Sequence, residues 1–366
     1  MGGQEMNYIK SAFDDNWIAP LGPNVNGFEK DLSDYLGSDN HVAVLSSGTA
    51  ALHLALILLG IEKGDDVLCQ SLTFSASANV IKYIGGNPIF IDSELQTWNL
   101  CPQVLEDAIK ARISLGKKPK ALIAVSLYGM PYRMDEVLNI CHHYGISVIE
   151  DSAESLGSMY KGQKLGTFGD ISVISFNGNK IITTSGGGAL ISKNPDHKRK
   201  AIYLATQAKE DAPHYEHVTL GYNYRMSNIA AGIGRGQMEV LSNHISRRRA
   251  NHFFYKSILD PVEGVSILHE PDENFYSNHW LNAILIDEKK INKSREDLRL
   301  AFLEHNIESR PLWKPMHLQP FFKDELYFGG QNAENLFEMG LCLPSGSNLT
   351  ESDKIRIKEV LENFFF

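Results

Sequence analysis

Residues 41–60 read HVAVLSSGTAALHLALILLG and set the architecture expected for the whole chain. The run from His41 to Leu45 is short, apolar and rich in valine, as in a buried β-strand. The Ala- and Leu-rich run at 50–60 is typical of a helix. The polar turn Ser46-Ser47-Gly48-Thr49 joins the two runs, so this stretch predicts the strand, turn and helix that α/β proteins repeat.

The same alternation continues on the C-terminal side of this stretch. The predicted strands are uninterrupted apolar runs, a pattern typical of strands buried on both faces of a parallel sheet that helices cover. We therefore expect an open α/β sheet in the first two-thirds of the chain. Expected strands span 66–72, 88–92, 121–126 and 147–151, and expected helices span 75–84, 102–115 and 135–144.

The pattern changes after residue 151. Two further strands, at 170–176 and 187–192, flank a loop rich in Asn, Thr, Ser and Gly, and long helices are expected at 196–208 and 227–255. Later segments mix strands and helices differently, with elements expected at 282–286, 295–305 and 353–365. A chain of 366 residues suits two domains, and we expect a large α/β domain over 1–255 and a smaller α+β domain over 256–366.

Composition argues against several classes of protein. The net charge is −9 and the pI about 5.8, with no basic stripe, so a nucleic-acid partner is not expected. No run approaches the roughly 18 apolar residues of a membrane span, and no signal region follows Met1, although a start upstream of Met1 is compatible with the sequence. The four cysteines are scattered without metal-site spacing, so we expect reduced thiols, no metal and a cytoplasmic location.

Lys180 is the first candidate for chemistry. It ends the string Ser-Phe-Asn-Gly-Asn-Lys (175–180) and precedes Thr-Thr-Ser-Gly-Gly-Gly (183–188). A lysine in such a loop is either a solvated side chain or an amine that condenses with an aldehyde, for which it must be neutral. The glycines allow a flat ring to approach the backbone, and Ser175 and Asn177 offer groups that could orient a ring or a phosphate.

Asp151 is the second candidate, because it ends a predicted strand. Open α/β sheets bind ligands at the carboxyl ends of their strands. A carboxylate at that place can pair with a protonated pyridine nitrogen and keep the ring an electron sink. The alternative is that Asp151 caps the next helix.

Two further strings complete a possible cofactor site. Gly48 and Thr49 lie at an expected helix N-terminus, where free amide groups and the helix dipole favour an anion such as phosphate, although the string also suits an ordinary helix cap and is not a P-loop. Phe74 follows another strand and is either a ring that stacks on a heteroaromatic group or a core residue. Together the strings supply an amine, a carboxylate, a phosphate nest and a stacking ring, the set that pyridoxal 5′-phosphate (PLP) needs.

The order of the motifs resembles the DegT–StrS family of sugar aminotransferases over nearly the whole chain. The matching strings are Ser-Gly-Thr-Ala-Ala-Leu (47–52), Thr-Phe-Ser-Ala-Ser (73–77), Glu-Asp-Ser-Ala-Glu (150–154), Ser-Phe-Asn-Gly-Asn-Lys (175–180) and Gly-Tyr-Asn-Tyr-Arg-Met-Ser-Asn (221–228). The resemblance implies the aspartate-aminotransferase fold (PLP-dependent fold type I) and a homodimer with active sites at the subunit interface.

The resemblance also implies a role for each matching residue. Lys180 would bond to the cofactor and move protons, and its presence favours transamination over the dehydration run by relatives with histidine at that position. Asp151 would pair with the pyridine nitrogen. The other implied cofactor contacts are Glu154 near the ring hydroxyl, Gly48, Thr49 and Ser175 at the phosphate, Phe74 on the ring face and Asn223 at the phosphate of the partner subunit's cofactor.

The substrate loops are most similar to the branch that makes 4-amino-4,6-dideoxy sugars on a nucleotide. Residues 16–23 resemble its substrate-binding loop, and Arg-Pro-Leu-Trp-Lys-Pro-Met-His (310–317) resembles bacillosamine-pathway enzymes, which aminate a UDP-linked 4-keto-6-deoxy-N-acetylglucosamine. Glutamate is the expected donor and a surface glycan the expected destination. Amination at C-3, a GDP- or dTDP-sugar, and a non-catalytic protein of the same fold remain alternatives. The expected substrate contacts are Ala19, Pro20, Leu21, Asn177, Arg310, Trp313 and His317.

Overall fold

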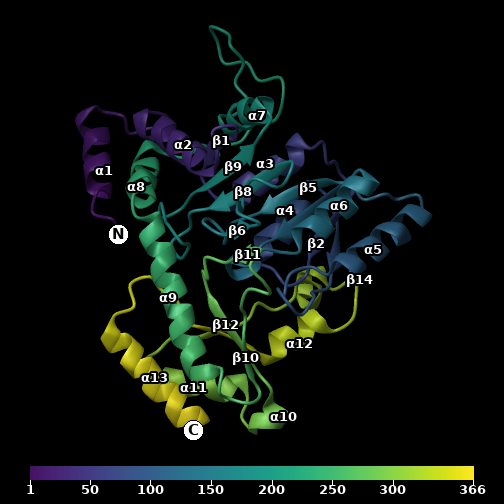
Figure 1. Cartoon of the computed structure of the whole chain (residues 1–366). Coiled ribbons are helices and arrows are strands. Elements are labelled where there is room, and N and C mark those ends of the chain that lie inside the picture. Colours follow the sequence, from purple (N-terminus) through teal and green to yellow (C-terminus); the bar gives the residue numbers. More distant parts are fainter.

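The computed structural model describes all 366 residues, and its central feature is one large sheet (Figure 1). The strands follow the order β1-β9-β8-β5-β4-β2-β3-β14. Neighbours from β14 to β8 are parallel, whereas β9 runs antiparallel to both β8 and β1. The strands of this sheet are β1 (His41–Leu45), β2 (Asp66–Gln70), β3 (Asn87–Ile91), β4 (Ala121–Val125), β5 (Ser147–Asp151), β8 (Ile171–Ser175), β9 (Gly188–Ser192) and β14 (Leu326–Phe328).

Helices cover both faces of the large sheet, as the apolar strands predict. All five residues of β2 and of β4 are buried. One core contains side chains of α3, α4 and α7, and a second core contains side chains of α5 and α6. The α/β class with a mostly parallel sheet is therefore confirmed. The helices are α1 (Glu5–Asp14), α2 (Pro23–Leu36), α3 (Gly48–Leu58), α4 (Ser75–Tyr83), α5 (Pro102–Ser114), α6 (Met134–Tyr144), α7 (Pro195–Ala205), α8 (Asn228–Met238) and α9 (Leu241–Leu259).

One predicted helix is wrong. The segment 227–255 forms two helices, α8 and α9, because Val240 leaves the helical conformation, with φ −114° and ψ 6°. The two helices serve different parts of the molecule. Helix α8 packs on α1 and α2, where a Cβ on Gly236 would lie 2.7 Å from the backbone N of Glu5, whereas α9 descends to the C-terminal sheet (Figure 1). Residue 255 lies inside α9, and the domain boundary there stays a prediction.

The C-terminal part has its own antiparallel sheet, in the order β10-β12-β15-β13. Side chains of α9, α11 and α13 pack with this sheet in a separate core. A minor sheet has the order β11-β6-β7. The remaining strands and α-helices are β6 (Met159–Tyr160), β7 (Gln163–Lys164), β10 (Val265–Ile267), β11 (Phe275–Tyr276), β12 (Asn282–Ile286), α10 (Glu288–Ile291), α11 (Arg295–Glu304), β13 (Arg310–Pro311), α12 (Asn332–Met339), β15 (Gly340–Leu343) and α13 (Glu351–Phe365).

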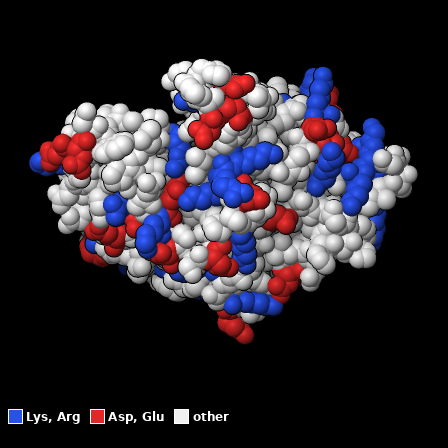
Figure 2. All heavy atoms as spheres, turned by 90° about the horizontal axis from the view of Figure 1, so that it is seen from above, with Lys and Arg blue, Asp and Glu red and all other residues white.

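Figure 2 shows Lys and Arg side chains interspersed with Asp and Glu over the face seen from above. None of the helices is both long enough and apolar enough to cross a membrane.

Candidate active site

A cavity of about 1120 Å³ lies between the large sheet and the C-terminal part of the chain. The end of β5, the N-terminus of α3 and the loop after β8 contribute one wall, and segments from residues 280 to 357 contribute the other. Most of the predicted site residues meet here. Those that line the cavity are Gly48, Thr49, Phe74, Asp151, Glu154, Ser175, Asn177, Lys180, Arg310 and Trp313.

Lys180 lies in the loop between β8 and β9, which turns back on itself at this point. The Lys180 amide donates to the Asn177 carbonyl at 3.0 Å, closing the turn. The side chain is only 10% exposed, unlike that of a solvated loop lysine. Its Nζ lies 3.3 Å from Glu154 Oε1 and 4.1 Å from the centre of the Trp280 ring. The loop therefore holds a primary amine inside the cavity.

Asp151 ends β5 with its carboxylate buried at the cavity wall. The Ser77 hydroxyl donates to Oδ2 at 2.8 Å, and the Ala153 amide donates to Oδ1 at 3.2 Å. The next helix along the chain begins only at Pro195, so the alternative of a helix cap is wrong. Burial raises the pKa of Asp151, while the bonds from Ser77 and Ala153 and the charge of Lys180 act in the opposite direction. A cation placed against this carboxylate would offset its desolvation.

Glu154 is buried beside Lys180, and its other oxygen holds a strained turn. The amide of Tyr128 donates to Glu154 Oε2 at 2.7 Å, and Tyr128 has a left-handed backbone with φ 55°. Such a conformation costs free energy in a bulky residue and persists only where its surroundings enforce it. Burial raises the pKa of Glu154 to about 7, although Lys180 and the Tyr128 amide lower it.

This pKa predicts a pH-dependent stability in the cofactor-free chain. The pKa of this carboxyl group rises on folding from 4.5 to about 7, so ionising the group costs folding stability. The whole cost applies above pH 7, and it disappears as the pH falls below 4.5. Glu154→Gln has no such titration. The quantity to compare is the free energy of unfolding of the variant minus that of wild type. We expect this difference to be about 2–3 kcal/mol larger at pH 8 than at pH 5. Urea denaturation of both proteins across this range measures the difference, and parallel profiles would contradict the prediction.

The N-terminus of α3 presents free amide groups to the cavity. The Ser47 side chain accepts from the Ala50 amide, which leaves the amides of Gly48 and Thr49 without an acceptor in the chain. The backbone is also tightly packed, since a Cβ on Gly48 would lie 3.0 Å from Ser175 Cβ. Orphan amides at the positive end of a helix dipole are suited to a phosphate.

Aromatic side chains from both parts of the chain line the cavity. Phe74 is 54% exposed, so the alternative of a core phenylalanine is wrong. Its ring centre lies 5.5 Å from that of Trp313, which is in turn 5.1 Å from Tyr128 and 6.3 Å from Trp280. The rings are tilted against one another, and those of Phe74, Trp280 and Trp313 give the cavity aromatic faces of the kind that a heteroaromatic ring contacts.

Several predicted residues lie outside the cavity. His317 makes a bond of 2.6 Å with Ser71 and one of 3.2 Å with Glu334, and its ring stacks on Tyr327, so this geometry does not support a substrate contact. Asn223 is exposed on the segment before α8. The predicted substrate contacts between α1 and α2 do not line the cavity either; these are Ala19, Pro20 and Leu21. Asn228, the first residue of α8, holds the loop that contains Ala19. Its side-chain amide donates to the Trp17 carbonyl, and its backbone amide donates to the Ala19 carbonyl.

Two residues in direct contact with Asp151 and Lys180 were missed from the sequence. Ser77, which bonds to Asp151, belongs to the quoted string 73–77, where its hydroxyl gave no signal beyond a helix start. Trp280 comes from the C-terminal part of the chain, and no local pattern connects it with Lys180. Only the tertiary fold brings these residues together.

The residues present fit PLP. A buried carboxylate can face a protonated ring nitrogen, an amine in the same cavity can bond to the aldehyde, and orphan amides at a helix N-terminus can bind the phosphate. This arrangement at the strand ends of a mostly parallel sheet defines a PLP-dependent enzyme of fold type I.

Comparison with known proteins identifies the family. The chain belongs to the DegT/DnrJ/EryC1/StrS aminotransferase family, which matches residues 1–362. It is 49% identical to EpsN of Bacillus subtilis (strain 168), named as a PLP-dependent aminotransferase, over 100% of this chain and 94% of that protein. It is 36% identical to GDP-perosamine synthase of Escherichia coli O157:H7, over 99% and 96%. A family aminotransferase from Brucella abortus superposes with a TM-score of 0.91 at 28% identity, covering 99% and 95%. The protein is thus a PLP-dependent nucleotide-sugar aminotransferase.

Proposed function

We propose that the enzyme transfers the amino group of L-glutamate to C-4 of a UDP-linked 4-keto-6-deoxy-N-acetylhexosamine, giving a 4-amino-4,6-dideoxy sugar for a surface glycan. The observation that carries the substrate proposal is the string 310–317, which resembles bacillosamine-pathway enzymes and whose Arg310 and Trp313 line the cavity that contains Lys180. The similarity to a GDP-perosamine synthase keeps a GDP-sugar as the second candidate.

The residue roles follow from the contacts within the cavity. PLP, when bound, supplies an electron sink that makes the α-hydrogen of the donor acidic. Lys180, with its Nζ inside the cavity, would hold the cofactor through its aldehyde and would accept the proton removed from the α-carbon of the donor; for the sugar it would carry a proton in the opposite direction, to C-4. General acid–base catalysis of this kind typically accelerates a step by about 10²–10⁴-fold. Asp151 would keep the ring nitrogen protonated, and Glu154 would contact the ring hydroxyl.

The outer part of the cavity suits the nucleoside diphosphate group of such a sugar. Arg310, Lys314 and Arg356 line it from the C-terminal part of the chain. Basic side chains bind phosphate oxygens through charge-assisted hydrogen bonds. The volume of about 1120 Å³ is also large for an amino acid alone, whereas a nucleotide sugar would occupy much of it.

We also expect a homodimer in which Asn223 reaches the partner subunit's site. The chain between α7 and α8 projects from the molecule at the top of Figure 1 and exposes Tyr215, Val218 and Leu220. Exposed apolar groups on a projecting segment are typical of an interface, and a second copy of this chain is the expected partner. Sedimentation should give twice the chain mass of 40.9 kDa. A monomer that retains full activity would contradict this proposal.

A panel of nucleotide keto-sugars tests the substrate. Purified enzyme is incubated with glutamate and with UDP-, GDP- and dTDP-linked 4-keto and 3-keto sugars, and the products are identified by mass spectrometry and NMR. We expect the highest kcat/KM with the UDP-linked 4-keto-6-deoxy-N-acetylhexosamine and an amino group at C-4. Preference for a GDP-sugar, or amination at C-3, would replace the proposal, and no amination of any of these sugars would refute it.

A further inference from the structure

We propose that Trp280 is a positioning residue for Lys180, and that Asn278 fixes Trp280 to the opposite wall of the site. The proposal rests on the catalytic role proposed above for Lys180. Trp280 is 2% exposed and comes from the segment that leads into β12, about a hundred residues from Lys180 in the chain. It therefore ties the C-terminal part of the molecule to the amine.

Trp280 contacts Lys180 at two points. Its indole N–H donates to the carbonyl of Asn179 at 2.7 Å, and this carbonyl belongs to the peptide bond that enters Lys180. The face of the same ring lies 4.1 Å from Lys180 Nζ. A desolvated ammonium group is attracted to the face of an indole ring, the most favourable aromatic partner for a cation. One side chain thus restrains both the backbone and the amine of Lys180.

Asn278 connects the two groups that flank the amine. Its side-chain amide donates to the carbonyls of Glu154 and Leu156, at 2.9 and 3.0 Å, and its Oδ1 accepts from the Trp280 amide at 2.8 Å. Gly129 makes room for this side chain, since a Cβ there would lie 1.9 Å from Asn278 Oδ1. The spacing between the Glu154 carboxylate and the Trp280 ring is therefore fixed by a buried hydrogen-bond network.

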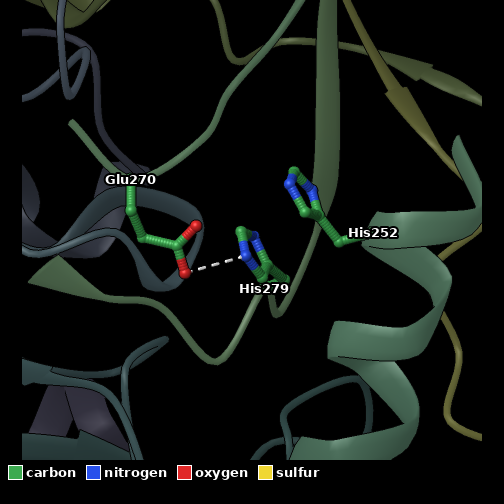
Figure 3. A group of neighbouring side chains, drawn as sticks. All are labelled: His252, Glu270 and His279. Atoms are coloured by element: carbon green, nitrogen blue, oxygen red, sulfur yellow. Dashed lines mark ion pairs between the residues drawn. The ribbon is translucent and has the colours of Figure 1, made fainter. Parts of the chain in front are cut away.

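A cluster of three side chains lies next to the chain segment that precedes Trp280. Figure 3 shows its members, His252, Glu270 and His279. The two imidazole rings stack with their centres 3.7 Å apart and an angle of 4° between their planes. Ring lone pairs lie in the ring plane, so stacked rings do not direct them at one point, as a metal ion would require. Glu270 Oε1 is also bonded to Arg249, at 2.6 Å, and lies 3.1 Å from His279 Nε2. The cluster is therefore better suited to fixing the segment before Trp280 than to holding a metal.

For catalysis, these contacts restrict the conformations open to the Lys180 side chain. Lys180 carries its amine on four flexible methylene groups, and ordering such a side chain costs conformational entropy. The Trp280 ring and the Glu154 carboxylate already confine the amine within the cavity. Misplacement of a reacting group by about 1 Å can lower a rate by about 10²-fold, so loss of the ring should impair turnover without touching the substrate pocket's basic side chains.

The test compares Trp280→Leu and Trp280→Phe with Phe302→Leu as a matched control. Phe302 is also a fully buried aromatic residue of the C-terminal part, but it packs in the core of α11 and α13. We expect Trp280→Leu to lower kcat on the order of 10–100-fold with little change in either KM, and Trp280→Phe, which keeps a ring face, to recover part of the loss. Phe302→Leu should lower stability but retain kcat at a temperature where the protein stays folded.

A second readout does not depend on turnover. The cofactor-free full-length chain is treated with an acetylating reagent, and modification of Lys180 is followed by peptide mass spectrometry. We expect several-fold faster modification in Trp280→Leu and wild-type rates in Phe302→Leu. Unchanged kcat and unchanged Lys180 reactivity in Trp280→Leu would overturn the inference, as would an equal loss of kcat in Phe302→Leu. Full turnover in Lys180→Arg would instead overturn the role of Lys180 itself.

Discussion

Lys180→Ala will abolish turnover while the protein still binds PLP weakly. The change removes the amine that lies 3.3 Å from Glu154 and leaves Asp151 and the amides at the N-terminus of α3 in place. Because Lys180 both bonds to the cofactor and moves the proton in the proposed mechanism, we expect kcat to fall by about 10⁴-fold, the upper end of the range for general acid–base catalysis. Turnover with glutamate and a keto-sugar, together with the absorbance of the bound cofactor, measures both effects.

Two matched variants separate chemistry from electrostatics. Lys180→Arg keeps a positive charge beside Glu154 but remains protonated at any accessible pH, so it should be as inactive as the alanine variant. Lys161→Ala removes an exposed lysine that pairs with Asp135 and should retain wild-type kcat. Wild-type turnover in Lys180→Ala would refute the assignment.

The parts of the fold that could be predicted are those encoded locally. Seven of the eight strands of the large sheet could be predicted from short apolar runs, and their observed bounds differ from the predicted ones by at most about two residues. The edge strand β14 (Leu326–Phe328) was missed. Lys180 and Asp151 were predicted as site residues because each lies at or beyond the end of one of the predicted strands, within a string that carries the family resemblance. Both side chains are largely buried and line the same cavity, and their roles stay predictions.

The parts that could not be predicted depend on tertiary contacts. The break between α8 and α9 has no glycine or proline at Val240, and it reflects the packing of α8 on α1 and α2 rather than a local signal. His317 matched a family string, yet its ring nitrogens bond to Ser71 and Glu334. Trp280 carried no motif at all, and only the fold places it against Lys180.

Asp151→Asn is expected to have the second-largest effect. The amide has nearly the same shape as the carboxylate, and the Ser77 hydroxyl, which now donates to Oδ2, can rotate to accept from it. The negative charge that, in the proposed mechanism, would keep the ring nitrogen protonated is lost, however. A hydrogen bond to a charged group contributes about 1.5–3 kcal/mol, so the Kd for PLP should rise about 10–100-fold. Removing a charge that stabilises the transition state should also lower kcat on the order of 10²-fold.

The neighbouring residue on the same strand provides a control. Glu150 is also fully buried, but alternate side chains of a strand point to opposite faces. Its carboxylate accepts from Ser152, Ser172 and the amides of 166, 168 and 169, away from the cavity. Glu150→Gln should therefore lower stability without changing the Kd for PLP measured on folded protein. If Asp151→Asn left the cofactor spectrum, Kd and kcat unchanged, or if Glu150→Gln weakened the cofactor equally, the carboxylate at the end of β5 could not be the partner of the ring nitrogen.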